Sequence, residues 1–597
     1  MLKILYRLNS EKIEQFYYRA TTFLILSIFL LSILGIWWRF NITLVSFALV
    51  ISVIASYFTS GSDIFKSNND FVLVALLIFL LQCSSTFLVS FIPTFTYDEV
   101  AYSVSLPKHY VAAHKFYYVD NYGPYSAFPQ NFETITSVSL LFFDSPFLAK
   151  VINYILGFGM VLAANRMAIQ CGVSKKTSIL AGLFVGCSIS LITSLPIAKN
   201  DILNSFFQVW TIVFLIEYFI QKRIIFAVII GVLLGSAIGT KYNSLIFSIV
   251  PIGFFLAITH LSSMPYKDKL QRYVGLFLFL LLAAFPWYLR NALEFHNPVY
   301  PVANQFFLGM NLYNQTYINV FNEIFYDDIV DFSWASGTIL VFLKKHIHGL
   351  GAVVSLFGFL GLCLGLTSKN EARFLSLTLI ALSIITLRFG FWEPRYNLTL
   401  LIVISVFAAF FFDKALEFIQ SKSPSFNTNV ATNIMVVVFC MIGFFSGFKI
   451  YHSIEYEFLV NRPQFLALNV PYWKVANFLN QNTPRYSKIG VGFGANQMFY
   501  YLDRPYYHFH PMTEKGDLLN KITPNDFITL IRNQSIDYLA ISSCCSYGHT
   551  PGKTPVLSLF MKRFYEGIAN LSESHMIEKV AQIDDVIIYK VMKAETK

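Results

Sequence analysis

Long apolar segments recur along most of this chain, and they restrict what it can fold into more than any other feature. A helix needs about 20 apolar residues to cross a bilayer, and VINYILGFGMVLAANRMAI at 151–169 meets this length. Segments of spanning or near-spanning length lie at about 21–38, 42–58, 71–93, 147–166, 178–196, 203–220, 224–239, 243–260, 274–289, 349–366, 374–391, 397–412 and 431–448. The sequence therefore predicts a polytopic α-helical membrane protein with about 13 transmembrane helices.

The composition excludes an ordinary soluble enzyme. Of the 597 residues, 55% are hydrophobic and 13% are charged, whereas soluble domains carry about 25% charged residues. The net charge of +10 does not indicate nucleic-acid binding, because Lys and Arg are scattered over short loops instead of clustered on one face. By the positive-inside rule, the N-terminus and these basic loops lie in the cytoplasm. The loops are near 175–176, 222–223, 267–272, 369–373 and 414–422.

Beyond about residue 450 the long apolar segments stop, and an odd number of spans places this tail outside the cytoplasm. Short buried strands are predicted at 487–494, 536–543 and 585–592, with helices at 472–481 and 524–533 between them. We therefore expect a transmembrane catalytic domain at 1–450, with outer loops at about 94–146 and 290–348, and an extracytoplasmic α/β domain at 451–597.

Acidic residues stand at the outer ends of two predicted spans, where an ionisable group is costly unless it has a use. Asp98 and Glu99 follow the third apolar segment, in FTYDEVAYSVSLPKHYVAAHKF, and Asp201 follows the fifth, in LPIAKNDILNSFF. Each acid could instead cap a helix, so both interpretations stay open. As functional groups, acids from two separate turns suit a sugar hydroxyl or a divalent metal ion, the candidate cofactor.

Basic and aromatic residues at the same predicted face form a second candidate set. Lys241 lies in GTKYNSLIF, Arg290 in FPWYLRNALEFHNPVYP, and Arg395 with Tyr396 in EPRYN. An ammonium or guanidinium group at a membrane border can bind a lipid phosphate. The structural alternatives are a snorkelling lysine and an ion pair between Arg395 and Glu393.

Several familiar motifs are missing or weak. No G-x-S-x-G, H-E-x-x-H or P-loop sequence occurs, which disfavours a nucleophile-elbow hydrolase, a zincin and an ATP-driven pump. VGFGAN at 491–496 is a poor dinucleotide fingerprint. The adjacent Cys544 and Cys545 lack the further Cys or His that a metal site requires, and a vicinal disulfide is their alternative.

Seven segments together resemble the GT-C superfamily of membrane glycosyltransferases. The likeness is strongest to lipid A aminoarabinose transferases and protein O-mannosyltransferases, as in glycosyltransferase family 39. In chain order the segments are YDEVAYSVSLPKHYVAAHKF, FPQNFETI, SPFLAKVINYILGFGMVLA, LPIAKNDILNSFF, GTKYNSLIF, FPWYLRNALEFHNPVYP and EPRYNLTLL. They cover most of 71–410, and the α/β tail is similar to those found in this superfamily. The chain departs from the family pattern at RYNLT, which lacks the proline of an RYLLP-like signature.

The resemblance implies transfer of a sugar from a polyprenyl-phosphate donor to lipid A, another glycan or a protein, at the outer face of a bacterial inner membrane. Asp98, with Glu99 beside it, matches the first-loop acid of the family, and Asp201 matches its second outer acid. Glu133, in FPQNFETI, matches a glutamate of the loop and would share a metal ion with Asp201. The residues expected at the donor phosphate are Lys241, Arg290, Arg395 and Tyr396.

These observations predict an inverting glycosyltransferase in which Asp98 takes the proton of the acceptor hydroxyl. Basic residues, or a metal ion, would stabilise the leaving phosphate. A polysaccharide polymerase or ligase is one alternative, although the loop at 290–348 has few Arg residues. A transporter of lipid-linked sugars is another, although it predicts internal repeats. In a third alternative, an assembly protein acting through its tail, the outer acids would be dispensable.

Overall fold

The computed structural model describes residues 10–58, 72–303, 306–307, 336–368, 371–388, 394–492, 495–511, 513, 518–523, 526–542 and 555–592. The chain divides into two compact units. Unit 1 comprises 1–93, 129–287 and 332–456, and unit 2 comprises 94–128, 288–331 and 457–597. The Cys544–Cys545 pair, Glu393 and part of the VGFGAN sequence lie outside the described residues.

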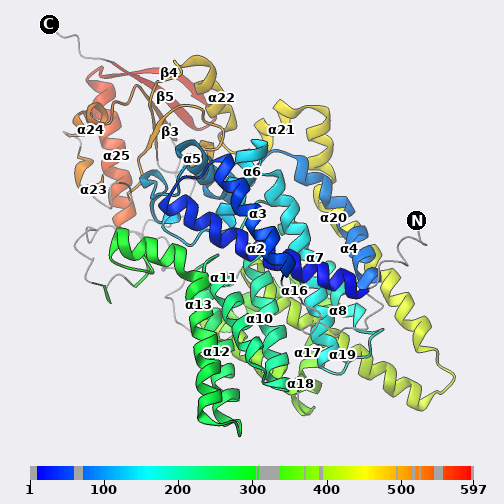
Figure 1. Ribbon diagram of the computed structural model, residues 1–597. Helices are drawn as coiled ribbons and strands as arrows, with labels where there is room; N and C mark the ends of the chain where they lie inside the picture. Colours follow the sequence, from blue (N-terminus) through cyan, green and yellow to red (C-terminus); the bar gives the residue numbers. More distant parts are fainter. Residues whose placement is uncertain are drawn as a thin grey trace. The chain divides into compact units, whose positions relative to one another are not determined.

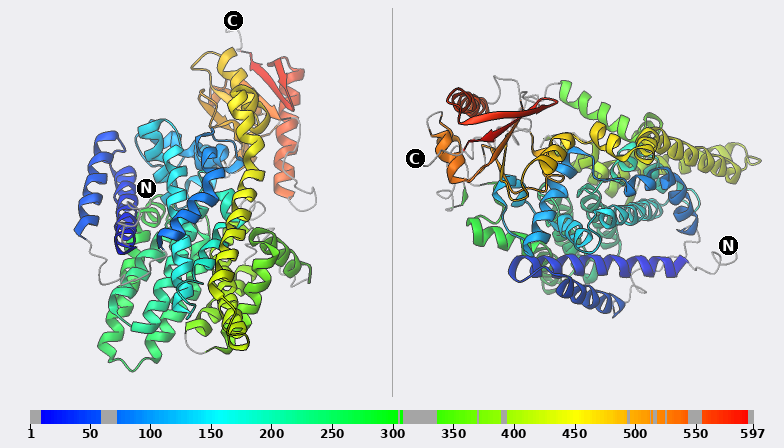
Figure 2. Two further views of the ribbon diagram at one scale, coloured as in Figure 1. Left: turned by 90° about the vertical axis from the view of Figure 1, so that its right-hand side faces the viewer. Right: turned by 90° about the horizontal axis from the view of Figure 1, so that it is seen from above.

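Unit 1 consists of helices, many of which run alongside one another in a bundle (Figures 1 and 2). They are α2 (Ser10–Trp37), α3 (Ile42–Phe58), α4 (Val72–Phe87), η1 (Leu88–Phe91), α6 (Asn131–Phe143), α7 (Phe147–Gln170), α8 (Ile179–Gly186), α9 (Ile189–Ser194), α10 (Asp201–Gln221), α11 (Ile224–Ile238), α12 (Asn243–Leu261), α13 (Tyr266–Phe295), α16 (Ser336–Leu350), α17 (Ala352–Thr367), α18 (Glu371–Arg388), η6 (Pro394–Asn397), α19 (Leu398–Lys422) and α20 (Thr428–Val460). The helices α13 and α20 continue into unit 2.

Within the described residues, seven helices are long and apolar enough to cross a membrane, and the bent pair α16–α17 would make an eighth. The apolar helices at Ile42–Ser56 and Ile224–Ile238 are shorter. The predicted class, a polytopic helical membrane protein, is confirmed, whereas the total of about 13 spans stays a prediction. The helix α10 is the most enclosed of the seven spans, with 94% of its apolar window buried, so residues at its outer end have fixed surroundings.

One apolar segment that the sequence predicts as a single helix is broken, and a sharp bend precedes another. The segment 178–196 forms α8 and α9, separated by Ser188 in an extended conformation (φ −64°, ψ 121°). The chain bends by 112° between α16 and α17, where Gly351 has φ +95°, a conformation that glycine adopts readily. The hydroxyl of Ser188 donates a hydrogen bond to the carbonyl oxygen of Gly349 (2.9 Å), which holds the two breaks together.

Unit 2 contains a five-stranded mixed sheet with strand order β2-β1-β3-β5-β4. Its strands are β1 (Ile489–Val491), β2 (Tyr506–His508), β3 (Tyr538–Ser542), β4 (Ile577–Ile583) and β5 (Val586–Val591). The strand β1 is parallel to β2 and β3, and β5 is antiparallel to β3 and β4. The small α/β domain is therefore confirmed, with β1, β3 and β5 at the predicted strands.

Helices cover this sheet and close its core. They are α21 (Arg462–Asn469), α22 (Trp473–Asn482), η7 (Asn496–Met498), α23 (Leu518–Lys521), α24 (Phe527–Asn533) and α25 (Pro555–Glu573). Phe527 of α24 and Phe560 and Phe564 of α25 pack with Phe509 and Leu539 in one buried cluster, and α25 runs along the sheet in Figure 1. Unit 2 also contains three short elements of the first outer loop: η2 (Glu99–Ser103), α5 (Ser105–Ala113) and η3 (Asp120–Ser126).

The close packing of α17 on α19 generates the first prediction. A Cβ atom on Gly361 would collide with the carbonyl oxygen of Phe407, whereas a Cβ atom on Gly253 in α12 would meet nothing within 4 Å. Small residues let membrane helices approach closely, and overpacking costs about 1–3 kcal/mol. We expect Gly361→Ala to lower the thermal unfolding midpoint of the detergent-solubilised protein and Gly253→Ala to leave it unchanged or raise it. Equal midpoints for the two variants would contradict the close α17–α19 contact.

Candidate functional site

A buried ion pair lies at the N-terminal end of α10. Asp201, the first residue of this helix, has a side chain that is only 3% exposed. Its Oδ1 atom accepts a hydrogen bond from the ammonium group of Lys241 (2.5 Å), which follows the end of α11. The ammonium group of Lys199 lies 3.9 Å from Oδ2. Two segments that are 40 residues apart thus meet through opposite charges, because the α10–α11 hairpin returns the chain to the same face.

Arg395 and Tyr396 complete this cluster from η6. The Lys241 ammonium lies 4.1 Å from the centroid of the Tyr396 ring, and the Arg395 guanidinium lies 4.9 Å from it. Arg395 also donates a hydrogen bond to the Tyr396 hydroxyl (3.0 Å). Cations are attracted to the face of an aromatic ring, so Tyr396 holds two positive side chains that would otherwise repel each other.

Three cations converge on one carboxylate in this cluster. Lys199, Lys241 and Arg395 all act on the Asp201 carboxylate. The carboxylate thereby fixes the positions of its positive neighbours. The arrangement suits the binding of an anion such as a phosphate group.

A cavity of about 260 Å³ opens beside this cluster. Its walls are formed by Ile189, Ser190, Thr193, Ser194, Ile197, Lys199, Asp201, Ile202, His348, Gly349, Pro394 and Arg395. The three hydroxyl residues share one face of α9, at spacings of three and four. A side chain on Gly349 would crowd the Ser190 hydroxyl, since its Cβ would lie 2.5 Å from Oγ. Both helix breaks therefore shape the wall of a polar cavity.

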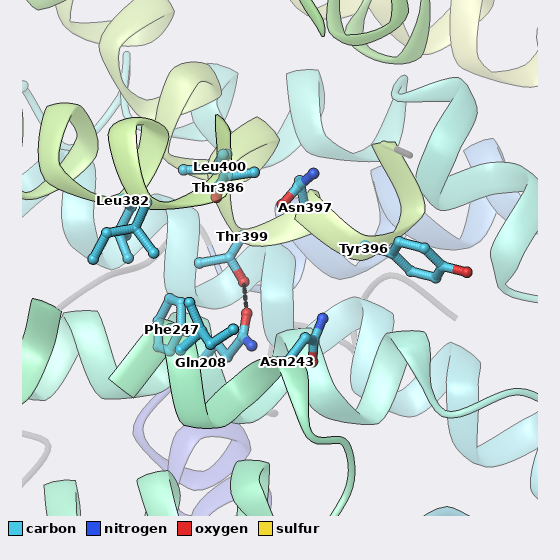
Figure 3. Close-up of a pocket in the computed structure, with 11 residues that line it drawn as sticks. Gln208, Asn243, Phe247, Leu382, Thr386, Tyr396, Asn397, Thr399 and Leu400 are labelled. Atoms are coloured by element: carbon cyan, nitrogen blue, oxygen red, sulfur yellow. Dashed lines mark hydrogen bonds between the residues drawn. The ribbon is translucent and has the colours of Figure 1, made fainter. Parts of the chain in front are cut away.

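A smaller cavity of about 30 Å³ lies among α10, α12, α18 and α19 (Figure 3). Thr399 donates a hydrogen bond to Gln208 Oε1 (2.8 Å), and Gln208 Nε2 donates to Ser244 (2.9 Å). In Figure 3, Tyr396 borders this cavity with its hydroxyl turned away from Gln208 and Thr399. That hydroxyl accepts a hydrogen bond from Arg395, which lines the larger cavity. Tyr396 therefore connects the walls of the two cavities.

Glu133 lies in the first turn of α6 and is buried, with 4% exposure. Its Oε2 atom has no hydrogen-bond partner within the described part of the chain. The charges of Lys241 and Asp201 both act on it. The backbone N–H of Asn131 donates to the carbonyl of Gly239 (3.1 Å), which fixes the start of α6 against the turn that precedes Lys241.

These residues fit a divalent metal ion poorly. Among the residues that the structure describes, no group of three or more His, Cys, Asp or Glu side chains could hold a metal. Asp201, one of the two ligands expected from the sequence, is paired with ammonium groups on both carboxylate oxygens. Ammonium and metal cations would compete for the same oxygens. The chemistry proposed below therefore has no step through a metal.

Asp98 and Glu99, the acid pair of the first outer loop, belong to unit 2 and have different surroundings. Glu99 is fully buried, and its Oε2 atom accepts hydrogen bonds from the Thr96 hydroxyl (2.9 Å) and the Thr96 backbone N–H (3.3 Å). Thr96 and Glu99 are three residues apart and form the reciprocal half of a capping box. Glu99 therefore stabilises the turn on which Asp98 stands.

Asp98 does not cap this turn. Its backbone is helical (φ −66°, ψ −32°), and its side chain makes no capping hydrogen bond. The side chain is partly exposed, in contrast to that of Glu99. The five residues after it, Glu99–Ser103, form a π-helical turn, a conformation often found at functional sites. After this π turn the chain continues as α5, whose C-cap residue, His114, has a left-handed backbone (φ 54°).

Arg290 also lies in unit 2 and is 4% exposed. Its Nε and a terminal nitrogen donate to Asn291 Oδ1 (3.2 and 3.0 Å). The amide of Asn291 donates in turn to the carbonyl of Ala127 (2.8 Å), which attaches the Arg290 segment to the first outer loop. Asp98, Glu99 and Arg290 thus all belong to unit 2.

The structure therefore sorts the expected residues into two groups, one in each unit. Unit 1 brings together Asp201, Lys241, Arg395 and Tyr396, with Glu133 coupled to them electrostatically. Sequence reasoning did not single out the hydroxyl face of α9 or the wall formed by His348 and Gly349. The spacing of Ser190, Thr193 and Ser194 could have indicated the hydroxyl face of α9. The two glycines in HGLG could have indicated the wall formed by His348 and Gly349.

The Asp201–Lys241 pair supports a prediction on stability. Removing one partner of a buried ion pair leaves the other uncompensated and is destabilising. We expect Asp201→Asn and Lys241→Met to destabilise unit 1, and the double variant to lose less than their sum, with a coupling of about 0.5–3 kcal/mol. SDS-induced unfolding in micelles measures this coupling. The matched control is the exposed pair Lys414 and Glu417 (2.8 Å), whose coupling should lie near the lower limit. Additive losses at Asp201 and Lys241 would contradict the pairing.

Comparisons with known proteins agree with this architecture. Residues 108–297 match the family model described as dolichyl-phosphate-mannose-protein mannosyltransferase. ArnT from Cupriavidus metallidurans bound to undecaprenyl phosphate is similar over 88% of this chain and 98% of its own, with 15% identity and a TM-score of 0.58. Its apo state gives a TM-score of 0.55 over 87% and 96%, again at 15% identity.

A third solved structure is more distant. The archaeal oligosaccharyltransferase AglB from Archaeoglobus fulgidus, in complex with an inhibitory peptide and a dolichol-phosphate, is similar over 88% of this chain and 75% of its own. The identity is 11% and the TM-score is 0.50. No curated protein matches the chain in sequence. The family match and these structures confirm the resemblance seen in the sequence: the chain is an integral membrane protein with the GT-C fold of membrane glycosyltransferases.

Proposed function

We propose that this protein transfers a sugar from a polyprenyl-phosphate donor to a glycolipid, glycan or protein acceptor at the outer face of a bacterial inner membrane. The observation that carries the proposal is the convergence of three cations beside the cavity in unit 1. Lys199, Lys241 and Arg395 all act on the Asp201 carboxylate, and two of them, Lys241 and Arg395, lie against the Tyr396 ring. A phosphate at a membrane border is the anion that such a cluster fits.

The acceptor hydroxyl is a weak nucleophile and requires a base. In the proposed reaction its oxygen attacks the anomeric carbon while its proton passes to the Asp98 carboxylate. The bond between the anomeric carbon and the phosphate oxygen breaks on the opposite face, which inverts the configuration. Asp98 is the better candidate for the base, because Glu99 is buried and engaged by Thr96, whereas Asp98 is partly exposed.

The leaving group gains negative charge as the bond breaks. The electron pair of that bond stays on the phosphate, so polyprenyl phosphate departs with one more charge than the donor had. Positive groups fixed in advance stabilise this developing charge without reorganising. Lys241 and Arg395 are assigned this role, Asp201 orients the two lysines, and Arg290 is a further candidate phosphate contact. Glu133, coupled to Lys241 and Asp201, would tune their charge.

The carrier lipids of the similar structures support the choice of donor. ArnT from Cupriavidus metallidurans was solved with undecaprenyl phosphate, and AglB from Archaeoglobus fulgidus with a dolichol-phosphate. Both ligands are polyprenyl phosphates of the kind that this reaction would release. The sugar and the acceptor follow from neither comparison, so the experiment below is designed to identify both.

Comparison of three bacterial strains tests the proposed function. Surface glycolipids, glycans, glycoproteins and polyprenyl-phosphate sugars are analysed by mass spectrometry in a deletion strain and in the deletion restored with wild type or with Asp98→Asn. We expect one sugar to disappear from an acceptor in the deletion, its lipid-linked form to accumulate, and only the wild type to restore transfer. General-base catalysis contributes about 10²–10⁴-fold, which is the loss expected for Asp98→Asn.

Asp144→Asn is the matched control for this strain comparison. Asp144 is an exposed carboxylate with a left-handed backbone (φ 50°), a conformation that Asn tolerates, so this variant should restore transfer fully. Immunoblotting confirms that all variants reach equal levels in the membrane. Full restoration by Asp98→Asn would reject the base and favour the transport or assembly interpretations. Unchanged glycans in the deletion strain would reject the transferase itself.

Removal of divalent metal tests the role assigned to the lysines. Because the Asp201 oxygens are paired with ammonium groups, we expect EDTA to leave the transfer rate unchanged. The assay uses membranes from the deletion strain that carry the protein, with the lipid-linked sugar extracted from that strain as donor. Loss of activity in EDTA and its recovery with Mg²⁺ or Mn²⁺ would show that a metal, not the lysines alone, balances the phosphate charge.

A further inference from the structure

A short part of the C-terminal domain makes several contacts with the loop that carries Asp98. This part, residues 496–508, runs from η7 to the end of β2 and is named the tail segment here. Its partners are the acid turn, residues 94–99, and the two elements that follow, α5 and η3. All of them belong to unit 2.

The tail segment contacts the acid turn at two residues, Thr94 and Tyr97. The hydroxyl of Tyr501 donates a hydrogen bond to the carbonyl oxygen of Thr94 (2.5 Å). The side chain of Asn496 also interacts with that of Tyr97. Tyr97 is the residue before Asp98, and Thr94 is two residues before Thr96, where the capping box begins. The tail segment thus contacts the turn immediately beside the proposed base.

The helix α5 is attached next. The ammonium group of Lys108 lies 3.1 Å from Asp503 Oδ1 and donates a hydrogen bond to the carbonyl of Tyr500 (3.0 Å). His109 Nε2 and the Tyr506 hydroxyl are hydrogen-bonded at 2.7 Å. Burial lowers the pKa of His109 to about 4, helped by the charge of Lys108, so the imidazole is neutral at physiological pH and brings no net charge into this contact.

The third attachment pairs η3 with the edge of the sheet. The strand β2 is an edge strand, and the side-chain amide of Asn121 bonds its outer side twice. Asn121 Nδ2 donates to the carbonyl of Tyr506 (3.2 Å), and Oδ1 accepts from the backbone N–H of His508 (3.0 Å). An amide can thereby replace a neighbouring strand and cover an exposed edge. The hydroxyls of Tyr122 and Tyr506 also meet at 2.7 Å.

We propose that the C-terminal domain is a positioning element of the transfer reaction: Tyr501 and Asn496 fix the acid turn, and through it Asp98, in the orientation that deprotonates the acceptor. This inference rests on the proposed function of Asp98. The domain is thus part of the catalytic apparatus and not an independent binding module. Tyr501 and Asn496 are positioning residues, since they contact the turn and not the reacting atoms.

The physical reason is the short range of proton transfer. A base must lie within about 3 Å of the proton that it takes, and a displacement of about 1 Å can cost 10²-fold in rate. The acid turn has its own capping box, but a single turn is a weak structure in isolation. The Tyr501 hydrogen bond and the Asn496 contact restrict the turn at little further entropic cost, because the domain that supplies them is already ordered.

Tyr501→Phe tests this proposal, because it removes one hydroxyl and keeps the ring. Tyr486→Phe is the matched control, since Tyr486 belongs to the same domain and is 88% exposed. Initial rates are measured in membranes with the lipid-linked sugar extracted from the deletion strain. We expect Tyr501→Phe to lower the maximal rate about 10–100-fold at an unchanged KM for the donor, and Tyr486→Phe to change neither.

A double variant shows whether Tyr501 acts through Asp98. If it does, adding Tyr501→Phe to Asp98→Asn produces no further loss, because residues that act as a unit are not additive. The proposal would be overturned if the double variant lost activity by the product of the two single-variant factors. A wild-type maximal rate for Tyr501→Phe would also overturn it. If Asp98→Asn itself keeps full activity, the base assignment has failed, and the measurement below still decides whether the domain fixes the turn.

Hydrogen exchange gives the second readout, which requires no activity. In full-length protein in detergent, we expect Tyr501→Phe and Asn496→Ala to speed amide exchange in peptides covering 94–104, while Tyr486→Phe leaves it unchanged. Exchange in α24 and α25, far along the chain in the core of the same domain, should stay slow in all variants and thus show that the domain is folded. Unchanged exchange at 94–104 would overturn the positioning role.

Discussion

The ion pair between Asp201 and Lys241 is the interaction on which the site in unit 1 depends. An ionised carboxylate is costly to bury alone, and its ion pair with Lys241 offsets this cost. Lys199 and Arg395 also act on the Asp201 carboxylate. The folded protein thus keeps positive groups close together in the absence of a ligand. The packing of α10 against α11 offsets the repulsion between these groups.

The helix breaks are the other requirement of this site. In a continuous helix over 178–196, the hydroxyl side chains would pack against neighbouring helices. The extended Ser188 lets α9 start in a new direction, and its bond to Gly349 ties α9 to the bend before α17. Broken helices expose polar groups within a membrane protein only where they line a cavity, and here the cavity of about 260 Å³ lies at both breaks.

The sequence predicted the helical membrane class and three strands, since these follow from local apolar runs. It missed β2 and β4 because YYH is short and most positions of IEKVAQI are exposed, without a regular alternation of polar and apolar residues. It predicted that Asp201, Lys241 and Arg395 would share a face, yet the Asp201–Lys241 pairing required the register of a hairpin that no local pattern specifies. The contacts of Thr94 and Asn121 with the tail segment span almost 400 residues of chain and were out of reach of any pattern.

The acid pair shows most clearly how local structure can assign roles. Either Asp98 or Glu99 could have capped a helix, and the sequence left the choice open, although Thr96 and Glu99 have the spacing of a capping box. Successive residues on a helix point about 100° apart, so neighbouring acids cannot both turn back to Thr96. Glu99 is engaged there, and the same geometry directs the Asp98 side chain elsewhere. Glu99 thus orders the turn that carries Asp98, the base in the proposed reaction, and the tail segment restricts that turn further.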